Sequence, residues 1–243
     1  MFADDLSAGD GNELESKFRA AHSSSALAVN CFAPYKNSPS DLKLAGRVGF
    51  EKLRFESKCP TGIRGGRAPN LDVLAESDSL VVGVESKCTE YLTRKSWSAK
   101  KPPFRSAYFE QIQDERRLGA WYRAMEEIDR RRDRFGYLDV AQLVKHAFGL
   151  SRVFKGQNVV LLYLYWEPST SEGFDEFEAH RSEIADFSTM LGGGFPRFES
   201  LTYDGLWKSW SDSQTPPWLS KHIENMRQRY CLSLSRATKK TMW

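Results

Sequence analysis

An aspartate, a glutamate and a lysine in the first half of the chain have the residue types of a metal-dependent hydrolytic site. They are Asp72, in "PNLDVLAE", and Glu85 and Lys87, in "VVGVESKC". Two carboxylates that converge can hold a divalent cation such as Mg²⁺, which prefers oxygen ligands. An ammonium beside them can orient the attacking water and stabilise charge on a phosphorane-like transition state. The set fits hydrolysis of a phosphodiester bond.

A β-hairpin would bring these residues together. Residues 70–75 and 80–87 are rich in strand-forming residues, and they flank a turn-like "ESDS" at 76–79. With residues 76–79 as the loop, Ala75 pairs with Leu80. The residues that then share one face are Asp72, Gly83, Glu85 and Lys87.

In this register Asp72 lies opposite Gly83, and Glu85 is its diagonal neighbour, roughly 7–8 Å away between backbone positions. Gly83 carries no side chain, so space remains for a cation between the two carboxylates. The opposite face would carry Leu71, Val73, Val82 and Val84 and could bury against a helix.

The string Glu-Ser-Lys occurs three times, so the motif alone is weak evidence. The copy at Glu15 begins a charged helix, and the copy at Glu56 is followed by a loop rich in Gly and Pro. Only the copy at Glu85 follows a buried apolar run. Glu56 ends a neighbouring predicted strand and so could join the same site. The alternative for Glu85 and Lys87 is a charged face on an exposed hairpin.

The remaining segments predict a mixed α/β architecture. Helices are expected at about 12–22, 23–35, 105–130, 137–150, 171–191 and 216–234, with strands at 48–56 and 158–166 and a short strand followed by a helix within 197–207. We therefore expect a small mixed sheet with helices on both faces, in a single nuclease-like domain over residues 1–243. Within it, residues 1–11 form a loose tail, 23–166 the core and 167–243 a mostly helical part packed on the core.

Composition bounds the class of protein. The chain has 243 residues, a formal net charge of +3 and four separated cysteines, as in a soluble protein with reduced thiols. The acidic N-terminus is not typical of a targeting signal. The longest apolar run, residues 159–166, is far shorter than the ~20 residues of a membrane helix. We expect a cytoplasmic protein without a membrane partner.

An ordered set of motifs resembles the PD-(D/E)XK nuclease superfamily, which has a restriction-endonuclease-like fold. The chain reads "SSSALAVNCF", "RFE", "PNLDV" and "GVESKCTE" in that order, over about residues 23–91. The set is similar to an uncharacterised branch with an "SSxALxxNxF" helix and a "GxExKxxE" strand. One departure is Leu71, where the superfamily motif has Pro.

The resemblance implies roles for individual residues. Asp72 and Glu85 would be metal ligands, Lys87 the catalytic lysine, and Glu56 an additional catalytic and metal-binding acid. Supporting positions would be Glu90, Asn30 and Ser24. The cofactor would be Mg²⁺, with Mn²⁺ as a substitute.

Basic loop residues flank the predicted site and suggest a nucleic-acid-binding surface. They are Arg64, Arg67, Arg94, Lys95, Lys100 and Lys101, with Tyr91 and Trp97 among them. Cations beside aromatic rings can follow a phosphate backbone and stack bases. The alternative is that these loops are simply solvated.

The function expected from these observations is a Mg²⁺-dependent endonuclease that acts on nucleic acid, with DNA favoured by the resemblance. The alternative is a catalytically inactive module of the same fold that binds nucleic acid or protein.

Overall fold

A five-stranded mixed sheet forms the centre of the structure, a computed structural model that describes residues 23–64, 68–98, 100–111, 116–211 and 216–235. The strands lie in the order β1-β2-β3-β4-β5. The first three pair antiparallel, and β3, β4 and β5 pair parallel. Their bounds are β1 Lys52–Lys58, β2 Asn70–Glu76, β3 Leu80–Lys87, β4 Asn158–Tyr165 and β5 Arg197–Thr202.

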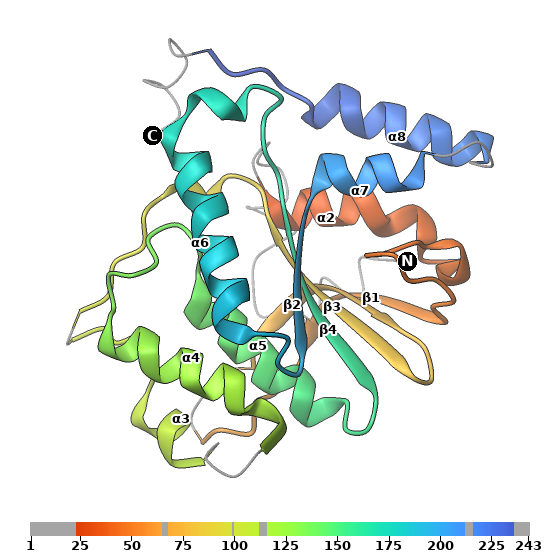
Figure 1. Cartoon of the computed structure of the whole chain (residues 1–243). Helices are drawn as coiled ribbons and strands as arrows, with labels where there is room; N and C mark the ends of the chain where they lie inside the picture. Colours follow the sequence, from red (N-terminus) through yellow and green to blue (C-terminus); the bar gives the residue numbers. More distant parts are fainter. Residues whose placement is uncertain (1–22, 65–67, 99, 112–115, 212–215, 236–243) are drawn as a thin grey trace.

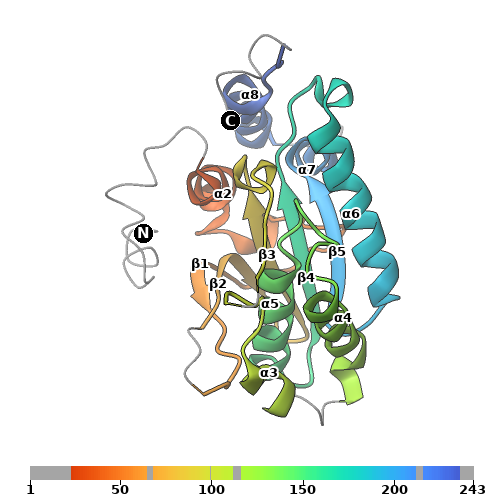
Figure 2. The ribbon, with the colours of Figure 1, turned by 90° about the vertical axis from the view of Figure 1, so that its left-hand side faces the viewer.

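Helices cover both faces of this sheet (Figure 1). On one face lie α4 (Gly119–Arg130), α5 (Val140–Val153) and α6 (Asp175–Leu191). On the other lie α2 (Ser24–Phe32) and α7 (Tyr203–Trp210), with α8 (Pro217–Tyr230) outside them (Figure 2). The predicted α/β restriction-endonuclease-like architecture is confirmed.

Shorter elements complete the described part. They are the short helix α3 (Ser106–Gln111) and three-residue 3₁₀ helices at η2 (Ala33–Tyr35), η3 (Pro39–Asp41), η4 (Glu90–Leu92), η5 (Arg116–Leu118) and η6 (Ser171–Gly173). Within the predicted helix over 105–130 the described residues form α3, the 3₁₀ helix η5 and α4, and residues 112–115 lie outside the described ranges. The predicted tail at 1–11 and helix at 12–22 lie outside the described residues.

The two central strands are buried because both of their faces are covered by helices. In β4 every residue from Val159 to Tyr165 is buried, which explains its continuous apolar run. In β3 the residues from Val81 to Ser86 are buried, Glu85 and Ser86 included. A buried charge requires polar or charged partners, so the buried Glu85 carboxylate indicates a polar site within the sheet.

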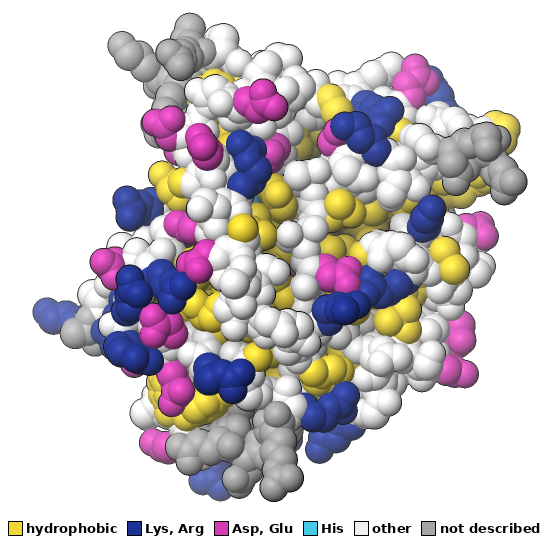
Figure 3. All heavy atoms as spheres, in the orientation of Figure 1, with side chains coloured by type: hydrophobic (Ala, Val, Ile, Leu, Met, Phe, Trp, Pro, Cys, Tyr) yellow, Lys and Arg dark blue, Asp and Glu magenta, His cyan; other side chains and the backbone are white. Residues whose placement is uncertain are grey.

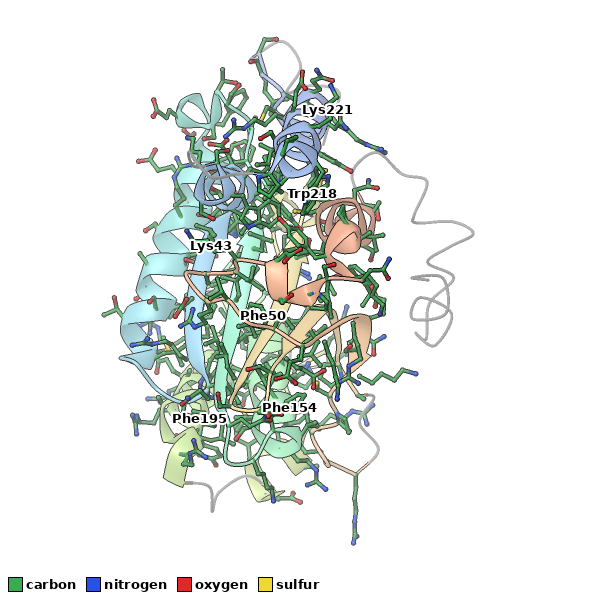
Figure 4. All side chains as sticks on the ribbon, turned by 90° about the vertical axis from the view of Figure 1, so that its right-hand side faces the viewer. Lys43, Phe50, Phe154, Phe195, Trp218 and Lys221 are labelled. Atoms are coloured by element: carbon green, nitrogen blue, oxygen red, sulfur yellow. The ribbon has the colours of Figure 1, made fainter. Side chains whose placement is uncertain are left out.

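The segment between α2 and β1 crosses the sheet on the α2 side, and Figure 4 shows it with Lys43 and Phe50 labelled. Phe50, near the end of this segment, is buried in the core. Arg47 fixes the segment to strand β5 through two hydrogen bonds to the Glu199 carboxylate, of 2.8 and 2.6 Å. No helix among the described residues has the length and apolar character needed to span a membrane.

Candidate functional site

The β2–β3 hairpin forms as expected, but its register differs from the predicted one. Leu74 pairs with Gly83, and the ladder ends at the pair Val73–Val84. The prediction that Ala75 pairs with Leu80 and Asp72 with Gly83 is wrong, because the turn comprises residues 77–80 and Ser77 N donates to Leu80 O. Asp72 and Glu85 are therefore the first residues beyond the ladder, level with each other.

The alternation of β2 also changes at this point. Gly83 lies beneath α5, since a Cβ there would stand 2.9 Å from a Leu150 methyl group. A methyl group of Leu71 approaches the same point to 2.9 Å, although alternation predicted Leu71 on the opposite face. The end of the hairpin is thus a distorted stretch in which Asp72 can leave the regular ladder.

Asp72 uses one carboxylate oxygen to accept a hydrogen bond from the backbone of β3. Ser86 N donates to Asp72 Oδ2 over 2.7 Å. The side chain keeps some exposed surface, yet protein surrounds it. Loss of hydration, then the charges of Glu85 and Glu56, raise its pKa well above the usual value. Three acidic side chains are therefore close enough to repel one another.

Glu85 is only 2% exposed and has two cationic or potentially cationic neighbours. Lys87 Nζ donates to its Oε1 over 2.5 Å, and His146 Nε2 lies 2.8 Å from its Oε2. Burial acts to raise the Glu85 pKa, but Lys87 and His146 outweigh burial and lower the pKa to about 2. Glu85 is thus held as a carboxylate.

Lys87 is held between β3 and α5. Its Nζ donates to Glu85 Oε1 and, over 3.0 Å, to Gln142 Oε1. Burial acts to lower the Lys87 pKa, but the carboxylates of Glu85 and Asp72 outweigh it and raise the pKa. Lys87 is therefore a fixed cation rather than a general base.

Glu56 lies inside β1, not at its end as predicted, because the strand continues to Lys58. The pairs Phe55–Val73 and Ser57–Leu71 bracket it, which places Glu56 level with Asp72. Its φ of 46° lies in the left-handed region that non-glycine residues seldom adopt. Ser25 Oγ donates to its Oε1 over 3.2 Å. The strand is distorted where this acid meets the start of α2.

The predicted supporting residues divide into two groups. Glu90 joins the start of α2 to the end of β3, since it accepts hydrogen bonds from Ser24 N (3.0 Å) and Cys88 N (2.8 Å). The Ser24 carbonyl accepts from Ser86 Oγ. Asn30 donates instead to the Tyr230 hydroxyl, so its hydrogen bond runs to α8 and not to the carboxylates.

Three residues that contact the predicted site were missed by sequence reasoning. They are Ser25, Gln142 and His146. Gln142 and His146 lie four residues apart in "QLVKHAF", so they share one face of a helix that otherwise buries apolar side chains. This spacing could have identified them. His146 is 0% exposed, and a buried imidazole needs a polar neighbour.

The predicted nucleic-acid-binding residues are mostly exposed. Arg64, Lys100 and Lys101 lie on exposed loops, and Arg67 lies outside the described residues. Arg94 and Lys95 line one pocket together with Trp97. Lys95 Nζ also pairs with Asp139, the N-cap residue of α5, over 2.7 Å.

The residues present suit a cation in two respects. The Glu85 Oε2 atom is buried, and its contact with His146 lacks the orientation of a hydrogen bond, so it has no such partner among the described residues. The Asp72 carboxyl group also lies in the field of two other acids. No group of three His, Cys, Asp or Glu side chains within the described ranges forms a ready-made metal cage.

Comparison with known proteins gives one match. The sequence fits, over residues 2–231, the family described as "Restriction Endonuclease associating with ARP". No curated protein and no solved structure matches the chain. Because the match spans nearly the whole sequence, the chain belongs to this restriction-endonuclease family.

Proposed function

We propose that this protein is a Mg²⁺-dependent endonuclease that hydrolyses phosphodiester bonds in nucleic acid, with DNA as its substrate. The observation that carries the proposal is the contact of Glu85 with Lys87 at the end of the β2–β3 ladder, level with Asp72. Membership of a family described as a restriction endonuclease supports the reaction class.

The metal-binding residues in this proposal are Asp72, Glu85 and Glu56. Mg²⁺ is usually held by one or two carboxylates together with waters and substrate phosphates, so a complete protein cage is not required. Bound Mg²⁺, or Mn²⁺ in its place, would polarise the phosphate and lower the pKa of a bound water. The repulsion that raises the Asp72 pKa would be relieved by such a charge.

The chain's own residues would then hold charge in fixed positions. Lys87, protonated and bonded to Gln142, presents a cation where negative charge develops on the phosphate. His146 Nε2 lies 2.8 Å from the second oxygen of Glu85. Glu90 and Ser24 tie the end of β3 to α2, which limits movement of the two strands that carry the acids.

A second candidate function is nucleic-acid binding without cleavage. The observation that favours it is the 2.5 Å contact between Lys87 Nζ and Glu85 Oε1, because a metal ion would compete with this ion pair for the same carboxylate. The family description also mentions association with ARP, and we extend that association to this chain only as a proposal.

A cleavage assay distinguishes the two candidates. Labelled DNA is incubated with the wild-type protein, Asp72→Asn or Lys87→Ala, with Mg²⁺ and with EDTA. We expect cleavage by the wild type with Mg²⁺ only, and a loss of at least about 100-fold in each variant. Asp78→Asn is the matched control, since Asp78 is an exposed aspartate at the turn of the same hairpin. Equal cleavage by all four proteins would contradict the assignment.

Thermal unfolding tests metal binding independently of cleavage. Asp72→Asn removes one of three mutually repelling charges, so we expect this variant to unfold at a higher temperature than the wild type in EDTA. Mg²⁺ should raise the unfolding temperature of the wild type but not that of the variant. A Mg²⁺ shift of the same size in both proteins would exclude Asp72 as a ligand.

A further inference from the structure

A pocket of about 390 Å³ lies between the loop that follows η4 and the end of α4. Its volume falls within the roughly 300–1,000 Å³ of small-molecule sites. Its lining residues are Arg94, Lys95, Ser96, Trp97, Arg132 and Asp133. Figure 3 shows Lys and Arg side chains interspersed with Asp and Glu over the left-hand side of the molecule, where α4 and its neighbouring loops lie.

The chemistry of the lining suits a nucleotide better than a simple anion. Trp97 is half-buried against the core and also lines the pocket, so part of its ring faces the space where a ligand would lie. Arg94 offers a guanidinium group, which binds phosphate in two-pronged fashion. Asp133 would repel inorganic phosphate but can accept hydrogen bonds from the amino groups of a base. A nucleotide with its base on Trp97, its phosphate on Arg94 and a base amino group on Asp133 would contact all three side chains.

Cations in the pocket differ in how far they are neutralised. Lys95 pairs with Asp139, and Arg132 pairs with Asp129. Arg94 has no carboxylate within ion-pair distance among the described residues. It lies along the backbone at Gly136, where a Cβ would stand 2.7 Å from its Nε. Arg94 is therefore the cation available to a ligand.

The pocket is connected to the proposed catalytic lysine through the first turn of α5. Lys95 Nζ contacts Asp139 Oδ2, and Asp139 Oδ1 accepts from Gln142 N over 3.0 Å. The side chain of Gln142 in turn accepts from Lys87. These contacts link one wall of the pocket to Lys87, so a single nucleic-acid strand could contact both.

We propose that the pocket binds one unstacked nucleotide, with the base against Trp97 and a phosphate on Arg94, so that the protein prefers nucleic acid with an unpaired segment. The proposal rests on the nuclease function above, because the same strand must occupy both places. The proposed catalytic residues alone do not distinguish nucleic acid with an unpaired segment from fully paired duplex.

Binding measured without cleavage tests this proposal. The full chain is titrated in EDTA against two fluorescein-labelled hairpin duplexes, one blunt and one with a short unpaired tail, each prepared as DNA and as RNA. Base stacking on an aromatic ring contributes enough for Trp97→Ala to weaken tailed-hairpin binding roughly 10-fold. Blunt-hairpin binding should change less than about 2-fold, and Trp97→Phe should retain most of the preference for the tail.

Arg94→Ala should also weaken binding of the tailed hairpin more than that of the blunt one. Lys221→Ala is the charge-matched control, because Lys221 is 64% exposed on α8 (Figure 4), and it should affect both ligands equally and slightly. Unchanged unfolding temperatures show that each variant is folded.

The proposal is overturned if Trp97→Ala weakens both hairpins equally, weakens neither, or if neither DNA nor RNA binds. Failure of the nuclease function gives a different result. In that case Mg²⁺ produces no cleavage, while the Trp97-dependent preference for the tail persists.

Discussion

Lys87 has one charged and one neutral partner, and the two contribute differently to the site. Glu85 Oε1 keeps the lysine protonated, whereas Gln142 Oε1 fixes where the ammonium points. A lysine held by an ion pair alone could still swing around the carboxylate. The Gln142 amide on α5 therefore holds the Lys87 ammonium in one position. Electrostatic stabilisation of a transition state requires charges that are held in place in this way.

This difference predicts the effect of Gln142→Leu. Lys87 keeps its ion pair with Glu85 but loses its second acceptor, so we expect kcat to fall roughly 10-fold with KM changed less. Gln142→Glu restores an acceptor and should retain more activity than the leucine variant. Gln228→Leu, on the exposed face of α8, is the control. Wild-type kcat in Gln142→Leu would show that Gln142 has no positioning role.

Residue types predicted the candidate acids and the lysine, because Asp72, Glu85 and Lys87 follow a strand pattern that would otherwise be apolar. Gln142 and His146 were missed for a physical reason. Their partners lie on a different element, and nothing in a helical period of 3.6 shows which buried polar residue faces a charge in the sheet. The cavity-lining role of Asp133 was hidden in the same way.

The sequence predicted the two strands of the β2–β3 hairpin but not the register in which they pair. Two strand-like runs with a polar turn predicted β2 and β3 almost to their ends. The turn has four polar residues, and its composition does not fix which pair closes it. The observed turn lies one residue later in the chain than the predicted one, which shifts the pairing by two residues. Leu74 therefore lies opposite Gly83 in place of Asp72.

Strand β1 contains a non-glycine residue, Glu56, with a backbone conformation that favours glycine. Glu56 adopts a φ of 46°, which costs a non-glycine residue about 1–2 kcal/mol. The strand predicted at 48–56 begins only at Lys52 and continues past Glu56 to Lys58. Such strain persists when a side chain is needed at that point.

We therefore predict opposite effects of glycine at two positions of β1. Glu56→Gly should be more stable than Glu56→Ala by about 1 kcal/mol, because glycine adopts positive φ without strain. Both variants should lose nuclease activity by about 10-fold or more. At Arg54, which has ordinary strand geometry, glycine should be the less stable of the two substitutions. Denaturant unfolding measures all four, and equal stability of the two Glu56 variants would contradict the strain.

At the scale of the whole molecule, the C-terminal helices are tied to the first described helix by polar contacts across the chain. Asn30 Nδ2 donates to the Tyr230 hydroxyl, Trp207 Nε1 contacts Cys31 Sγ over 3.4 Å, and His222 Nε2 lies 3.0 Å from Cys31 O. Because α2 also supplies Ser24 and Ser25 to the site, α7 and α8 support the site through α2, and the Tyr203 hydroxyl of α7 lies 2.7 Å from Ser86 Oγ.

A second interior cluster, on the α6 side, makes stability depend on pH. His180 is fully buried, stacks on Tyr91 at 3.9 Å between ring centroids, and lies 2.9 Å from the Tyr163 hydroxyl. Tyr165 packs edge-on against it, and the neighbouring charged residue is Arg181. Burial, with a smaller contribution from Arg181, lowers the His180 pKa to about 3.

The folded state therefore keeps His180 neutral at a pH where the unfolded chain protonates it. Below about pH 6.5 the unfolded state binds one more proton, so the free energy of unfolding should fall by up to about 1.4 kcal/mol per pH unit from this residue. The contribution is fully present above pH 6.5 and is lost as the pH falls toward 3. His180→Gln keeps a polar neighbour for Tyr163 but cannot be protonated. Denaturant unfolding between pH 7 and 5 should show a shallower loss of stability in this variant than in the wild type, whereas equal slopes would mean that His180 is already charged in the folded protein.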